Sequence, residues 1–124
     1  MLALGIDLSL TGTGLSVVEG NELHFSECYK PKAKTGPERL IEIRHKVLET
    51  IVIYQPKLIC LEGYSFGSKG RGVFQTGELG GVIRVLLHKS DTSWLEIPPS
   101  QVKKFAAGMG NCGKDIVLQQ VYKR

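Results

Sequence analysis

The sequence predicts an α/β protein built on one five-stranded mixed sheet with helices on both faces. Three observations support this fold class. Three short apolar stretches follow one another near the N-terminus, two amphipathic stretches come after them, and each of those precedes another short apolar stretch. Strands joined by tight turns pair antiparallel, whereas strands joined by a crossover helix pair in parallel. The expected order is therefore βββ-α-β-α-β-α-α, with an antiparallel meander joined to parallel strands.

The first three strands are short and are separated by turn residues. Residues 2–7 form an apolar run that ends in Asp7, and residues 15–18 are apolar and partly β-branched. Residues 23–29 alternate between apolar and polar side chains, and the glycine-containing turn at 19–22 joins them to the preceding strand. Alternation with a period of two and tight turns are typical of an antiparallel meander.

Two amphipathic stretches predict helices. Apolar side chains recur at helical spacing over about 16 residues from Glu38, until Pro56 ends the pattern. A second helical pattern covers residues 74–88, and its glycines indicate close packing against the sheet or a neighbouring chain, because they lower helix propensity. The expected inner faces are Leu40, Ile43, Val47 and Ile51, widened by Leu48 and Val52, in the first helix, and Leu79, Val82, Ile83 and Leu86 in the second.

Short strands alternate with these helices, and further helices follow. Residues 58–61 form an apolar strand that ends beside Glu62, and residues 94–97 form the fifth strand. A short helix through Phe105 and a last helix from Lys114 complete the order. With 124 residues and one modest core, the chain is expected to be a single domain.

The balance of charge favours a polyanionic partner. The formal net charge is +4 and the isoelectric point is about 9.0, which suits a nucleic acid. No apolar run approaches the ~20 residues that span a bilayer, and the N-terminus lacks the basic start and apolar stretch of a signal peptide. The sequence therefore predicts a cytoplasmic protein with no membrane partner.

Asp7 and Glu62 are the most informative polar residues. Each stands at the carboxyl end of a strand expected near the middle of the sheet. If these strands are neighbours, both carboxylates emerge at the edge where ligands bind in open α/β sheets. Two adjacent carboxylates repel each other, and a divalent cation that prefers oxygen ligands, such as Mg²⁺ or Mn²⁺, relieves this repulsion. Two such ions support phosphodiester hydrolysis. The alternative is that both side chains only cap their strands.

These motifs resemble a known family along the whole chain. Residues 4–15, with Gly-Ile-Asp and a glycine that turns the chain into the next strand, look like the opening of RuvC-type Holliday junction resolvases. Residues 61–64 resemble the second acidic motif of that family, and residues 74–87 resemble the glycine-bearing helix that follows it. Two basic motifs at 98–104 and 108–114 complete the resemblance.

The resemblance implies an RNase H-like fold and a homodimeric, Mg²⁺-dependent endonuclease that resolves four-way DNA junctions in recombination and repair. The dimer contact would lie on the helix at 74–87. Asp7 and Glu62 would be two of four catalytic, metal-binding carboxylates. The other two belong to an Asp-x-x-Asp motif on a later helix, which is not found up to Arg124. We therefore expect the domain to be truncated at its C-terminus and, in this 124-residue form, to be weakly active or inactive.

The glycine-rich loop after Glu62 contains candidates for DNA contact. Tyr64 and Phe66 are expected to stack on bases at the branch point, with packing onto the core as the alternative. Lys69 and Arg71 in the same loop are expected to contact phosphates, with solvated loop charges as an equal alternative.

Later lysines match the basic positions of the family. Lys103 would neutralise a backbone phosphate, and Lys114, at a helix N-terminus, would join an anion site and is counted among the catalytic residues. Lys30, Lys32 and Lys34 surround a proline; a solvated loop is the preferred interpretation, and an extension of the DNA-binding track is the alternative.

Two rival functions remain open at this point. The first is a catalytically incomplete relative that binds branched DNA without cutting it. The second is a lobe of the sugar-kinase and heat-shock chaperone ATPases, which also open with Gly-Ile-Asp and a turn that cradles phosphate. Metal-dependent nicking of a synthetic junction separates the nuclease from the first rival, and nucleotide binding separates it from the second.

Overall fold

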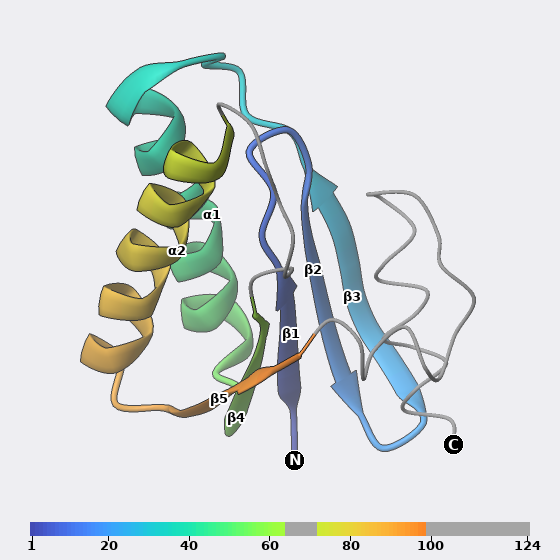
Figure 1. Cartoon of the computed structure of the whole chain (residues 1–124). Coiled ribbons are helices and arrows are strands. Elements are labelled where there is room, and N and C mark those ends of the chain that lie inside the picture. Colours follow the sequence, from blue (N-terminus) through green and yellow to red (C-terminus); the bar gives the residue numbers. More distant parts are fainter. Residues whose placement is uncertain (64–71, 99–124) are drawn as a thin grey trace.

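The computed structural model describes residues 1–63 and 72–98 of the chain. In these residues five strands form one sheet, and two helices pack against it (Figure 1). The elements are β1 (Ala3–Asp7), β2 (Thr13–Glu19), β3 (Glu22–Tyr29), α1 (Gly36–Tyr54), β4 (Leu58–Glu62), α2 (Gly72–Lys89) and β5 (Ser93–Ile97). Every expected strand and helix up to residue 97 is present, and α1 is longer than expected, at 19 residues.

The sheet combines the two expected pairing modes. Its strand order is β3-β2-β1-β4-β5. β1, β2 and β3 form an antiparallel meander, whereas β1, β4 and β5 are mutually parallel. The carboxyl ends of β1, β4 and β5 therefore meet at one edge of the sheet, which we call the carboxyl edge. β3 also ends at this edge, because it runs antiparallel to β2.

The hydrophobic core lies between the sheet and the two helices. Alternate residues of the central strands face the helices, and each helix contributes residues three or four positions apart. The buried core consists of Leu4, Ile6, Leu15, Val17, Ile59 and Leu61 from the sheet, Ile43, Val47 and Ile51 from α1, and Leu79, Ile83 and Leu87 from α2.

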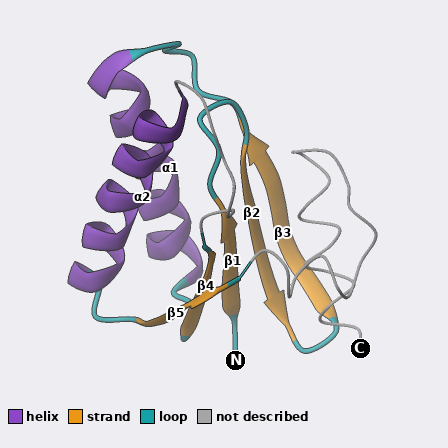
Figure 2. Ribbon diagram, in the orientation of Figure 1, coloured by secondary structure: helices purple, strands orange, loops and turns teal. Residues whose placement is uncertain are grey.

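Both described helices cover the same face of the sheet (Figure 2). The sequence predicts helices on both faces, and the later helices expected near Phe105 and Lys114 fall outside the described residues. Coverage of the second face therefore stays a prediction. Neither described helix is long and apolar enough to cross a membrane.

The buried stripes of the helices are narrower than expected. On α1, Leu48 and Val52 were expected to widen the inner face, but their side chains are 37% and 63% exposed. On α2, Leu87 is fully buried, while Val82 and Leu86 are only partly buried. The reason is geometric, because two helices share one sheet face and each presents only a narrow strip to it.

Candidate active site

The two strand-end carboxylates lie on neighbouring strands. β1 pairs with β4 in parallel, and their last registered pair is Ile6 with Leu61. Asp7 and Glu62 are the next residue on each strand, so their Cα atoms are separated by about one strand spacing, ~5 Å. The expectation that β1 and β4 are neighbours is confirmed, while the metal-binding and catalytic roles of the two side chains stay predictions.

Both carboxylates belong to the sheet face that α1 and α2 do not cover. Side chains alternate across a strand, and the preceding residues, Ile6 and Leu61, are buried in the core beneath the helices. Asp7 and Glu62 therefore project to the opposite face. Asp7 is only 5% exposed, whereas Glu62 is half-buried. A nearly buried carboxylate beside a second one is a donor set that fits a hard divalent cation.

Gly14 leaves space beside Asp7. The two residues are direct cross-strand partners on β1 and β2, and a Cβ atom added at Gly14 would lie 3.7 Å from the Cβ of Asp7. Any larger side chain at Gly14 would extend over the carboxylate. The sequence signal for this role was a glycine inside a short strand, which often marks a close approach, but sequence reasoning assigned Gly14 only to the turn.

The β1–β2 turn is held by its own hydrogen bonds. The Ser9 hydroxyl accepts hydrogen bonds from the backbone N–H groups of Thr11 and Gly12, both at 3.3 Å. The Thr13 hydroxyl donates to the Ser9 carbonyl at 2.8 Å and accepts from the Ser9 N–H at 3.2 Å. Because three amide groups of the turn have partners inside it, they do not form an open phosphate cradle. This observation opposes the ATPase interpretation.

On the other side, β5 anchors the end of β4. The N–H of Gly63 donates to the Ile97 carbonyl at 2.9 Å, so pairing continues one residue past Glu62. Glu96 of β5 forms an ion pair with Arg84 of α2, which ties the edge strand to the helix layer. The hydrogen bond from Arg84 holds the pKa of Glu96 below its usual range. Glu62 is therefore carried by a strand that is paired on both sides.

Cys60 shares the face of Glu62, two residues earlier on β4. Its thiol is partly buried and free. Burial raises the pKa of this thiol above its ordinary range, so it stays neutral at physiological pH. Cys60 therefore adds no third negative charge to the carboxylate pair.

The remaining predicted site residues cannot be placed relative to Asp7 and Glu62, because they lie outside residues 1–63 and 72–98. They are Tyr64, Phe66, Lys69, Arg71, Lys103 and Lys114.

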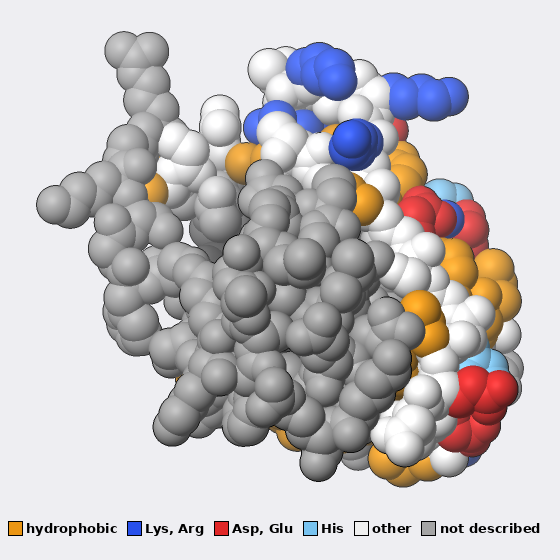
Figure 3. Space-filling model, turned by 90° about the vertical axis from the view of Figure 1, so that its right-hand side faces the viewer, with side chains coloured by type: hydrophobic (Ala, Val, Ile, Leu, Met, Phe, Trp, Pro, Cys, Tyr) orange, Lys and Arg blue, Asp and Glu red, His pale blue; other side chains and the backbone are white. Residues whose placement is uncertain are grey.

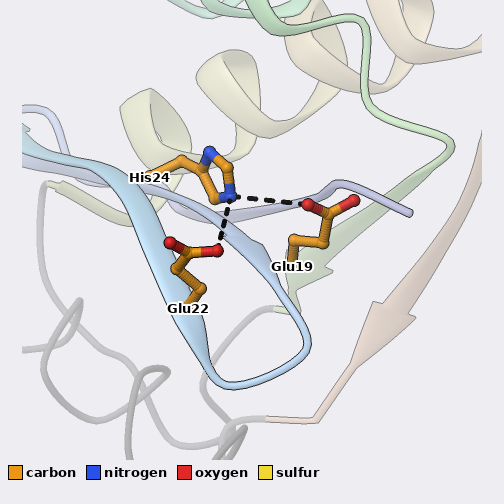
Figure 4. A group of neighbouring side chains, drawn as sticks. All are labelled: Glu19, Glu22 and His24. Atoms are coloured by element: carbon orange, nitrogen blue, oxygen red, sulfur yellow. Dashed lines mark ion pairs between the residues drawn. The ribbon is translucent and has the colours of Figure 1, made fainter.

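A second group of metal-ligating side chains lies at the opposite edge of the sheet, at the β2–β3 turn. Figure 4 shows Glu19, Glu22 and His24 gathered there, with the His24 Nε2 atom 3.6 Å and 3.7 Å from the two carboxylates. All three residues are exposed, and Glu19 also accepts a hydrogen bond from the Met1 amino group, which lowers its pKa. We interpret this group as a surface ion cluster that is separate from the carboxylate pair.

A five-stranded mixed sheet in the order β3-β2-β1-β4-β5, with two acidic residues at the ends of its central parallel strands, is the arrangement of RNase H-like nucleases. Residues 3–123 match the family model described as crossover junction endodeoxyribonuclease RuvC. The chain therefore belongs to the RuvC family of Holliday junction resolvases, a metal-dependent family.

Individual relatives agree with this assignment. The crossover junction endodeoxyribonuclease RuvC of Chloroherpeton thalassium is 29% identical over 128 aligned positions, which cover 99% of this chain and 69% of that protein. The fold is similar to that of T. thermophilus RuvC solved in complex with a Holliday junction substrate. The TM-score is 0.79 at 21% identity, and the match covers 98% of this chain and 93% of that one.

Only a similarity of fold supports the sugar-kinase interpretation. The ROK hexokinase from Thermus thermophilus matches with a TM-score of 0.53 and 16% identity, covering 90% of this chain and 39% of the hexokinase. A shared fold explains why the two groups open with the same Gly-Ile-Asp pattern. The family match over residues 3–123 decides in favour of the resolvases.

Proposed function

We propose that this chain is a Mg²⁺-dependent endonuclease that hydrolyses phosphodiester bonds at four-way DNA junctions inside the cell. Membership of the RuvC family supports the reaction class. The observation that carries the proposal is the register of β1 and β4, because it brings Asp7 and Glu62 to one edge of the sheet. The relative that was solved with a Holliday junction substrate supports a four-way junction as the DNA partner.

Asp7 and Glu62 are the residues that would hold the metal ion. Their carboxylate oxygens suit Mg²⁺, with Mn²⁺ as a substitute, and Gly14 leaves space beside Asp7. When bound, the ion supplies Lewis-acid chemistry at the scissile phosphodiester. The role of the protein is to keep the two carboxylates side by side on paired strands, so that the site reorganises little when the metal ion binds.

The DNA-contacting roles of the remaining residues belong to the same proposal. Tyr64 and Phe66 would stack on bases at the branch point, because both follow Glu62 closely along the chain. Lys103 would contact a backbone phosphate, and Lys114 would stabilise negative charge near the scissile bond.

The outer face of α2 supports a homodimer. Phe74 and Val85 are 82% and 56% exposed, and Gly77 and Gly81 share this face with them, because their positions differ by multiples of about 3.6 residues. A Cβ atom at Gly77 or Gly81 would have no neighbour within 4 Å. Each glycine costs the helix about 1 kcal/mol relative to alanine, and the open space around a Cβ atom at these positions shows that packing against the described residues does not require a glycine there. An exposed face that presents Phe74, Val85 and two glycines suits close packing against a second copy.

Sedimentation velocity of Gly81→Ala and Gly81→Glu tests the dimer. In an isolated chain Gly81→Ala should raise stability by about 1 kcal/mol, because the methyl group enters open space and improves helix propensity. In a closely packed dimer the same methyl group should weaken association, and Gly81→Glu should give monomers. A monomeric wild-type protein at micromolar concentration would contradict the dimer.

Cleavage of a synthetic four-way junction tests the activity. We expect Mg²⁺ to support paired nicks, EDTA to abolish them, and Asp7→Asn and Glu62→Gln to reduce the rate by at least 100-fold, on the order of the loss of one catalytic group. Glu96→Gln is the matched control, because Glu96 lies on the neighbouring strand but faces α2. Unchanged cleavage by Asp7→Asn would refute the assignment.

The binding-only relative is the second candidate function. Junction binding in EDTA without cleavage in Mg²⁺ or Mn²⁺ would support this candidate. Cleavage of the junction in the presence of either ion would exclude it.

A further inference from the structure

Three lysines line the connection between β3 and α1. Residues 30–34 alternate in exposure, with Lys30, Lys32 and Lys34 exposed, Pro31 buried and Ala33 half-buried. The three ammonium groups therefore face solvent together, while the residues between them face the protein. Figure 3 shows Lys and Arg side chains gathered at the upper end of one face, the end where this connection runs in Figure 1.

A single carboxylate of α1 holds this connection in place. Glu42 accepts hydrogen bonds from the backbone N–H groups of Lys32 at 2.9 Å and Ala33 at 2.7 Å, and from the Tyr29 hydroxyl at 3.1 Å. The two backbone N–H groups are the main reason why the pKa of Glu42 is lowered. We call residues 30–34, fixed in this way, the lysine platform.

The charges of the platform are available to an external partner. Within residues 1–63 and 72–98, Lys30, Lys32 and Lys34 take part in no ion pair. Lys46 shows the contrast, because it pairs with Glu27 at 3.1 Å and with Glu49 at 3.3 Å. Glu42 offsets part of this charge, because Lys32 also helps to lower its pKa, and three lysines against one carboxylate leave the platform with a net positive charge.

The platform begins close to the carboxylate pair. Asp7 is paired with Gly14 on β2, and Gly14 is paired with Cys28 on β3, so Asp7 and Cys28 are about two strand spacings, ~10 Å, apart. Lys30 follows Cys28 by two residues at the same edge of the sheet. Asp7 and the start of the platform are therefore close enough for one duplex to contact both.

We propose that Lys30, Lys32 and Lys34, held in position through Glu42, bind the phosphodiester backbone of one arm of the DNA junction beside the cleavage site. This inference rests on the proposed function, because it assumes that the scissile strand lies at Asp7 and Glu62. It also reverses the interpretation of these lysines as a solvated loop. The contacts are made to phosphates, so they position the arm and read no bases.

The first test is the salt dependence of binding. In EDTA, which prevents cleavage, a labelled four-way junction and a duplex of the same sequence are titrated with wild type and with Lys30→Ala/Lys32→Ala/Lys34→Ala. A plot of log K against log salt falls with a steepness of about 0.9 for each phosphate contact, so the plot for the triple variant should be less steep by about 2.7. Between 50 and 200 mM salt, the affinity of the wild type should therefore fall by about 40-fold more than the affinity of the triple variant. Both DNA forms should be affected alike, because an arm is a duplex. The control, Lys57→Ala/Lys89→Ala at the opposite edge of the sheet, should keep the wild-type slope.

The second test separates an ordered platform from charge alone. Glu42→Gln removes a negative charge near DNA, so simple electrostatics predicts tighter binding. The platform predicts weaker binding by several-fold, because the amide group of glutamine opposes a backbone N–H donor and releases the loop. Glu38→Gln removes the same charge from the exposed first turn of α1 and should leave binding unchanged or slightly tighter. Thermal melting shows whether each variant is folded. If Glu42→Gln does not fold, the salt dependence of the triple lysine variant alone decides the proposal.

The outcomes distinguish the two levels of the argument. Wild-type binding with an unchanged slope in the triple lysine variant would overturn the platform and leave the proposed function intact. No junction binding by the wild type would overturn both. Tighter binding by Glu42→Gln, with a reduced slope in the lysine variant, would keep the phosphate contacts and reject the role of Glu42.

Discussion

Asp7→Asn should raise the stability of the metal-free protein while it abolishes cleavage. Asp7 is 5% exposed and lies one strand spacing from Glu62. If the two carboxylates are separated by the same distance as their Cα atoms, about 5 Å, their negative charges repel by about 3 kcal/mol at an effective dielectric constant of about 20. Glu62 is half-buried and solvent screens the pair, so we expect a gain of about 1–2 kcal/mol. For a chain of this length the gain corresponds to a rise in Tm of about 4–8 °C.

The metal dependence of Tm makes this prediction specific. A Mg²⁺ concentration ten times the dissociation constant should stabilise the wild type by about 1.4 kcal/mol, because the ion binds only the folded state. Asp7→Asn should lose this stabilisation by Mg²⁺, whereas Glu96→Gln should keep it. The Glu96→Gln variant should start from a lower Tm, because it lacks the ion pair with Arg84. Scanning calorimetry with and without Mg²⁺ measures both effects. A lower Tm for Asp7→Asn with an unchanged Mg²⁺ increment would refute the reasoning and make Asp7 a strand cap.

Three further predictions address other parts of the molecule. The difference in unfolding free energy between wild type and Glu42→Gln should be fully present above about pH 4.5, and it should shrink as the pH falls through the lowered pKa of Glu42. The reason is that protonation removes the charge that the hydrogen-bond donors of Glu42 stabilise. Urea unfolding at several pH values measures this difference. Tyr64→Ala and Phe66→Ala should impair junction cleavage more than duplex binding, because only a branch point offers unstacked bases; equal losses would indicate core support. Lys103→Ala and Lys114→Ala should each slow cleavage and lower the salt slope by about one unit while the fold is retained; unchanged slopes would make them ordinary surface charges.

The strands were predictable because their signals are local. Asp7 ends a five-residue strand of otherwise apolar residues and Glu62 ends another, and the alternating βα order makes such strands parallel neighbours. Once the strands are parallel, equal lengths bring both carboxylates to the same edge. The position of the candidate site therefore follows from counting residues along two strands.

The widths of the helix faces were not predictable from periodicity. The pattern in α1 shows that Ile43, Val47 and Ile51 share a side, and this prediction is correct. It does not show how far the contact extends to Leu48 and Val52, because that depends on how much of the sheet α2 already covers. Width is a property of the packed layers, and a single helix sequence does not encode it.

The anchoring of the lysine platform was not predictable, for a related reason. Lysines around a proline are typical of a solvated loop, and nothing within residues 30–34 distinguishes the two interpretations. The deciding contact comes from Glu42, which lies nine and ten residues from the backbone groups that it binds. Glu42 also falls within the amphipathic pattern of α1, where an acidic residue is usually assigned to the solvent face.

The two edges of the sheet differ in charge, and this difference favours one orientation of DNA. The lysine platform and the carboxylate pair share the carboxyl edge, whereas Glu19 and Glu22 lie at the opposite edge, at the β2–β3 turn. β2 has seven residues, so the edges are separated by about 20 Å. Charges at that distance are screened from each other at physiological salt, where the Debye length is about 8 Å. A polyanion is therefore attracted by the lysine platform and repelled by Glu19 and Glu22 at the β2–β3 turn. The edge of the platform is the one where a bound cation would offset the charge of Asp7 and Glu62, so metal binding and DNA binding should be mutually favourable.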